Sequence, residues 1–73
     1  MSRLPVISGR QCFRALQKVG FVEDHQTGGH VILRRENPTV TISVPNHREL
    51  KKGTLRAIIK QAGLTVDEFV ELL

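Results

Sequence analysis

A glycine pair directly before a histidine is the feature of this sequence best suited to chemistry. Gly28 and Gly29 precede His30, which opens an apolar run over residues 31–33. Glycine reaches backbone angles that other residues avoid, and without a side chain it lets a phosphate backbone come close. The unperturbed pKa of a histidine side chain, ~6.5, lies near neutrality, so an imidazole can both take and give a proton. We therefore expect His30 to act as an acid/base residue beside a phosphodiester.

RNA would suit such a residue because it carries its own nucleophile, the 2′-hydroxyl. An enzyme must remove that proton, hold the phosphate and stabilise the developing charge, and one positioned acid or base contributes ~100–10,000-fold. Backbone N–H groups of the turn 27–29 can bind a phosphate oxygen, as other glycine-rich turns do. From the residues alone, the opposing interpretation of His30 is a strand-end histidine that hydrogen-bonds a loop.

Two further histidines have less defined roles. His47 is a candidate second acid or base or a phosphate contact; the alternative is a loop histidine that caps the second predicted helix, and the sequence leaves both open. His25 is expected to face solvent or a neighbouring strand. Nothing in the spacing of the histidines and acids indicates a metal site, so we expect neither a metal nor a cofactor.

The charge is basic and unevenly distributed. Eleven Lys and Arg against seven Asp and Glu give a net charge of +4 and a pI near 10.0. Three of the acids follow Thr65, so residues 1–64 hold all eleven bases against four acids. This asymmetry indicates a polyanionic partner such as nucleic acid.

Three of these basic residues lie at regular spacing on the second predicted helix. Lys52, Arg56 and Lys60 are four residues apart and so are neighbours on one helix surface, which we call the basic ridge. The functional interpretation is that the basic ridge, with Lys51, binds phosphates that flank the cleaved bond. The plainer one is a solvated helix face. Three Phe and no Trp or Tyr leave little capacity for base stacking, so we expect mostly backbone contacts.

The length of 73 residues is enough for one domain, which we place at residues 1–73. Cys12, the single cysteine, fits a reducing compartment and lies on an apolar helical stripe, so we expect it in the core. There is no apolar span of ~20 residues and no signal-peptide pattern, so we expect a cytoplasmic protein without a membrane partner.

The hydrophobic pattern predicts helices and strands in the order α-β-β-β-α-α. In chain order these are a helix at about 9–19 capped by Ser8 and stopped by Gly20, strands at 21–26, 30–35 and 39–44, a helix from Lys52 to its stop at Gly63, and a short helix with a Thr65–Glu68 capping box. Three strands with short turns predict an antiparallel meander with helices on one face, an α+β sandwich. Because residues 31–33 are all apolar, periodicity does not show which face His30 takes.

Several short motifs resemble the HicA family of mRNA interferase toxins. In chain order they are Ser8-Gly9-Arg10, Val19-Gly20-Phe21, Gly28-Gly29-His30, Val44-Pro45-Asn46-His47, Leu50-Lys51-Lys52-Gly53-Thr54-Leu55 and Gln61-Ala62-Gly63-Leu64-Thr65. Each motif is weak alone, but their order and spacing in so short a chain are specific. The resemblance runs over about residues 6–73.

The resemblance implies a single HicA-like domain with the fold of double-stranded-RNA-binding domains. It implies a toxin of a type II toxin–antitoxin system, a metal-independent endoribonuclease that cleaves mRNA and so inhibits translation, and a HicB-type antitoxin as partner. The family's catalytic histidine falls on His30; many members have a serine just before it, where this chain has Gly29. The expected RNA-binding residues are Gly28, Gly29, His47, Lys51, Lys52, Arg56 and Lys60. The alternatives are a non-catalytic double-stranded-RNA-binding module and a protein-interaction domain with an acidic partner.

Overall fold

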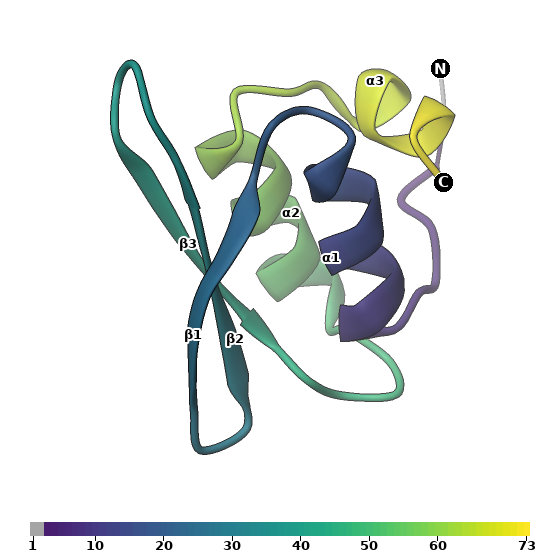
Figure 1. Ribbon diagram of the computed structural model, residues 1–73. Helices are drawn as coiled ribbons and strands as arrows, with labels where there is room; N and C mark the ends of the chain where they lie inside the picture. Colours follow the sequence, from purple (N-terminus) through teal and green to yellow (C-terminus); the bar gives the residue numbers. More distant parts are fainter. Residues whose placement is uncertain (1–2) are drawn as a thin grey trace.

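The computed structural model describes residues 3–73 and has two layers, a sheet and a set of helices (Figure 1). In chain order the elements are α1 (Gly9–Gln17), β1 (Val22–Thr27), β2 (His30–Arg35), β3 (Val40–Pro45), α2 (Lys52–Gln61) and α3 (Val66–Glu71). All the helices lie on one side of the sheet. This confirms the predicted α+β sandwich and its element order.

The sheet is antiparallel with the strand order β1-β2-β3, so β2 is central. In the β2–β3 register Leu33 pairs with Ile42 and His30 pairs with Pro45. In the β1–β2 register Asp24 is an extra residue between two paired positions, which is a β-bulge. Each strand boundary lies within one residue of its predicted place.

Alternation along the strands divides the sheet into two faces. Leu33, Ile42 and Val44 are buried against the helices. The positions between them in β3, Thr41 and Ser43, are exposed on what we call the open face. Side chains alternate along a strand, so a residue next to a buried one projects from the opposite face.

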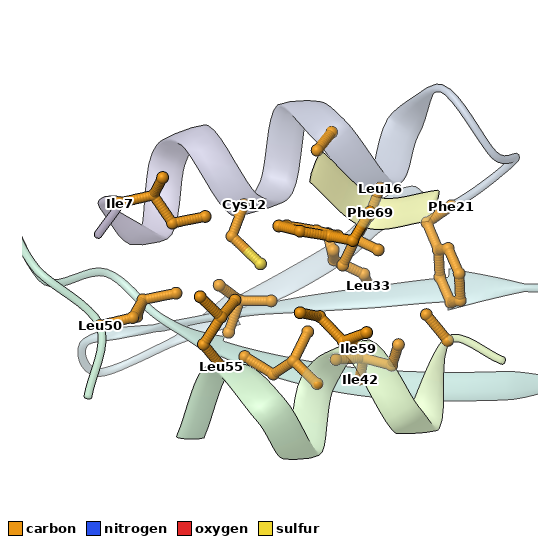
Figure 2. Packing of buried hydrophobic residues seen from close by; sticks show 14 residues of the cluster. Ile7, Cys12, Leu16, Phe21, Leu33, Ile42, Leu50, Leu55, Ile59 and Phe69 are labelled. Atoms are coloured by element: carbon orange, nitrogen blue, oxygen red, sulfur yellow. The ribbon is translucent and has the colours of Figure 1, made fainter. Parts of the chain in front are cut away.

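The core gathers residues from every element except β1 (Figure 2). Its buried members are Ile7, Cys12, Ala15, Leu16, Phe21, Leu33, Ile42, Val44, Leu50, Leu55, Ile58, Ile59, Ala62 and Phe69. Cys12 is a core residue, as predicted, and burial raises the pKa of its thiol to about 12. Phe21 and Phe69 are buried, whereas Phe13 is half-buried at the edge of the core.

Local sequence signals set the helix ends. Ser8 and Thr65 each form a capping box, the first completed by Gln11. Gly20 and Gly63 take left-handed backbone angles, with φ of 95° and 77°. At each, paired backbone hydrogen bonds close a Schellman motif, such as Phe21 N–H to the Leu16 carbonyl at 3.2 Å. Because this motif takes up the last turn, α1 ends two residues before the predicted boundary.

No helix within residues 3–73 has the length and apolar character needed to cross a bilayer.

Candidate functional site

His30 begins β2 at the tip of the β1–β2 hairpin. Thr27 pairs with His30, so Gly28 and Gly29 alone form the turn. Gly28 has φ of 46° and is the only one of the two with a positive value, the pattern of a type II′ hairpin turn. A Cβ atom on either glycine would meet nothing within 4 Å, so the space beside these two Cα atoms is open.

The structure decides which face His30 takes. Val31 packs against the core, so the adjacent His30 projects from the open face, where its side chain is exposed. The hydrogen bond to a loop that the opposing interpretation of His30 requires is not present, since the side chain makes no hydrogen bond to any residue between 3 and 73. Its imidazole is therefore accessible to a ligand.

The loop at residues 46–51 is fixed at the same end of the molecule as His30. The Asn46 N–H donates to the Gly29 carbonyl at 2.7 Å, extending the β2–β3 ladder by one step. The Gly9 N–H donates to the His47 carbonyl at 2.9 Å and so ties the loop to the start of α1. The hairpin turn, this loop and the start of α1 lie together at the lower end of Figure 1.

His47 is exposed in this loop. The N-cap of α2 is Lys51, and no side chain makes a capping hydrogen bond there. The interpretation of His47 as the cap of the second helix is therefore wrong. Its role as a second acid or base, or as a phosphate contact, stays a prediction.

The basic ridge is exposed along α2. A helix rises 1.5 Å per residue, so Lys60 lies ~12 Å along the axis from Lys52. Lys51 is the last residue of the loop that contacts Gly29, Lys52 begins α2, and the rest of the ridge runs away from that end. The side of α2 that faces β3 carries other residues, among them Thr54, Ala57 and Gln61. The structure therefore brings Lys51 and Lys52 closest to the His30 end.

A hollow of about 270 Å³ between α1 and β1 is lined by cationic side chains that lie outside the predicted RNA-binding residues. Phe13, Val31 and Val44 give it apolar walls, and Arg10 and Arg14 line it from α1. Both arginines are exposed, and neither forms an ion pair within the described part of the chain. The hollow extends to Gly9 and Asn46, the segments beside the hairpin turn. The spacing of the two arginines, four residues apart on one helix, was the signal that could have identified them.

The open face carries further charged groups. Arg34 Nε donates to Glu36 Oε1 at 2.7 Å, and Thr39 Oγ1 donates to Glu36 Oε2 at 2.6 Å. The Thr39 hydrogen bond, with the hydrogen bond and charge of Arg34, holds the pKa of the Glu36 carboxyl below its usual value. On β1, His25 Nδ1 lies 2.6 Å from Asp24 Oδ2, and His25 faces solvent as expected. The helices lie on the other side of the sheet, so a polyanion bound to the open face can reach His30 directly.

Comparison with protein families matches residues 9–64 to the HicA toxin of bacterial toxin–antitoxin systems. Comparison with curated proteins gives no match. The family match starts at α1 and ends after the glycine stop of α2, so it includes the sheet, the hairpin turn with His30 and the whole of the basic ridge. It covers well over half of the chain and agrees with the motif order and the fold. The chain therefore belongs to the HicA toxin family of bacterial toxin–antitoxin systems.

Proposed function

We propose that this toxin is an endoribonuclease that cleaves mRNA in the cytoplasm and so inhibits translation, with His30 as its acid/base residue. The observation that carries the proposal is the exposed imidazole of His30 at the start of β2, on the uncovered face of the sheet. It follows a turn of two glycines that leave the backbone open to a phosphate.

The chemistry needs little more than this. His30 removes the proton of the 2′-hydroxyl, whose oxygen then attacks the adjacent phosphate. The bond from phosphorus to O5′ breaks, and the leaving 5′-oxygen takes up a proton. The reaction uses no metal or cofactor in this scheme, because the nucleophile belongs to the RNA itself. Gly28 and Gly29 let the phosphate approach the backbone. His47 and Lys51 in the loop that contacts Gly29, and Lys52 at the start of α2, bind this phosphate or its neighbours.

Cations further from His30 bind flanking phosphates. The arginines of α1 lie along a hollow that reaches Asn46, and Arg56 and Lys60 continue the basic ridge. If these cations neutralise phosphates of a single RNA strand, the binding affinity should fall steeply as salt is added. The logarithm of the affinity should fall by ~0.7 per unit of log salt concentration for each phosphate neutralised.

The decisive experiment compares the purified toxin with its His30→Ala variant on an mRNA in buffer containing a metal chelator. We expect cleavage by the wild type and at least ~100-fold slower cleavage by the variant. Because the His30 side chain is exposed, the variant should unfold at about the same temperature as the wild type. RNA binding without cleavage by either protein would favour the double-stranded-RNA-binding module, and absence of RNA binding at low salt would favour a protein-interaction domain.

A toxin of this family has a cognate antitoxin, and we propose a HicB-type protein for this chain. Such a partner would silence the toxin by covering His30 or the basic ridge. In a competition experiment, the antitoxin should displace labelled RNA from the His30→Ala variant. A ternary complex of toxin, antitoxin and RNA would contradict this arrangement.

A further inference from the structure

A histidine and an aspartate form a close pair on the open face. The Nδ1 atom of His25 lies 2.6 Å from Oδ2 of Asp24, and the two side chains are 53% and 44% exposed. An ionised carboxylate only accepts hydrogen bonds, so Nδ1 carries the proton in this pair. Asp24 thus fixes the ring, and Nε2 of His25 has no hydrogen-bond partner within residues 3–73.

The bulge in β1 puts both members of the pair on this face. Glu23 points inward, since it pairs with Leu33 and lines the hollow beside α1. With regular alternation, the Asp24 side chain would then project outward and the His25 side chain inward. Asp24 is instead the extra residue, so alternation restarts and His25 also projects outward.

The register of the hairpin places this pair beside His30. His25 is paired with Ile32, and Thr27 with His30, so the two histidines are diagonal neighbours across the two strands. Such neighbours are ~7–8 Å apart in an antiparallel sheet, within reach of long or aromatic side chains. Two imidazoles on one uncovered face can therefore flank a single phosphodiester.

We infer that His25 is a second catalytic residue, the general acid that complements His30 as general base, and that Asp24 is its positioning residue. This rests on the proposed ribonuclease function. His30 takes the 2′-hydroxyl proton while the bond from O2′ to phosphorus forms. The bond from phosphorus to O5′ breaks, and the His25 imidazolium gives its Nε2 proton to O5′. The products are a 2′,3′-cyclic phosphate and a 5′-hydroxyl, with one proton taken and one given.

Charge favours this division of roles. The Asp24 carboxylate balances the positive charge of a protonated His25, which suits that ring to the donor role. Among the described residues of β2 and the turn that follows it, the other charged or titratable groups on the open face are His30, Arg34 and Glu36. The outward-facing residues of β3, Thr41 and Ser43, are uncharged.

The test uses two versions of one oligoribonucleotide, with either oxygen or sulfur at the 5′-bridging position of the cleaved bond. A thiolate leaves without being protonated, so a missing general acid costs nothing on the sulfur substrate. We expect His25→Ala to cleave the oxygen substrate about 100-fold more slowly or worse, and to cleave the sulfur substrate close to the wild-type rate. Asp24→Asn should show a smaller loss that also disappears on the sulfur substrate.

Two comparisons complete the design. Thr41→Ala changes the same face outside the site and should match the wild type on both substrates. His30→Ala should be slow on both, because the base is needed with either leaving group. On the oxygen substrate, the fall in rate at high pH that reports a required acid should be absent in His25→Ala.

The outcomes separate this inference from the proposed function. If the wild type does not cleave RNA, or if His30→Ala cleaves normally, the proposed function fails. If cleavage requires His30 but His25→Ala retains the wild-type rate, or is equally slow on both substrates, the assignment of His25 alone is overturned.

Discussion

The backbone N–H of Gly9 donates a 2.9 Å hydrogen bond to the carbonyl oxygen of His47, across 38 positions of sequence. This hydrogen bond holds the first turn of α1 against the end of β3 and the loop that follows it. The same loop donates from Asn46 to Gly29, at the hairpin turn before His30. The start of α1 therefore supports the segment on which the proposed site depends.

Gly9→Ala should destabilise the fold at this junction. A Cβ atom at position 9 would lie 2.0 Å from the Pro45 carbonyl oxygen, and that neighbour is backbone and cannot simply rotate away. We expect the free energy of unfolding to fall by about 1–3 kcal/mol or more, as for overpacking of a core. Gly53→Ala in α2, where nothing lies within 4 Å of the added atom, is the matched control. It should leave stability unchanged or raise it by up to ~1 kcal/mol, measured by urea denaturation.

The two glycines before His30 should differ in their tolerance of a side chain. Gly28 has a positive φ of 46°, so Gly28→Ala should cost about 1 kcal/mol or more. Gly29 has neither a positive φ nor a neighbour within 4 Å, so Gly29→Ala or Gly29→Ser should change stability by less than about 0.5 kcal/mol. Thermal unfolding of the variants measures this. Equal losses at both positions would contradict the type II′ assignment of the turn.

Removal of the α1 cations should weaken RNA binding more than removal of the far end of the basic ridge. Arg10 and Arg14 line the hollow that reaches the hairpin end, whereas Arg56 and Lys60 lie progressively further from it. In the His30→Ala background, Arg10→Gln/Arg14→Gln should reduce the salt slope of RNA affinity by about 0.7 for each phosphate that is no longer neutralised. Arg56→Gln/Lys60→Gln removes the same charge, so a larger fall in affinity in that variant would favour the ridge as the main RNA-binding surface.

The Cys12 thiol should be inert in the folded protein and should make stability depend on alkaline pH. Burial raises its pKa from 9.0 to about 12, so the folded state keeps its proton at pH values where the unfolded chain releases it. The stability that depends on a protonated Cys12 thiol is therefore fully present below pH 9, and it is lost as the pH rises toward 12. Reaction with a thiol reagent at pH 8 should require denaturant, and Cys12→Ala should remove the alkaline part of the dependence. Rapid labelling of the native protein would contradict this burial.

Most of the fold follows from local sequence signals. The apolar stripe with Ser8 before it and Gly20 after it specifies α1, because caps and glycine stops act on their own helix. Similarly, the Thr65 capping box specifies the start of α3. Alternation in residues 39–44 indicates which face of β3 is buried. These are interactions between near neighbours in sequence, and the family motifs could be identified from the same short stretches.

The sequence by itself determined the element order, the core position of Cys12, the basic character and the choice of His30 as the candidate catalytic residue. Only the tertiary structure decided that His30 projects from the open face, since the apolar run after it fits either face until Val31 meets the core. It also decided that a bulge turns His25 and Asp24 outward beside His30, and that α1 supplies arginines along a hollow next to the hairpin. Strand register and core packing depend on contacts between residues that are distant in sequence. The periodicity of one segment therefore does not predict which strand or helix it packs against.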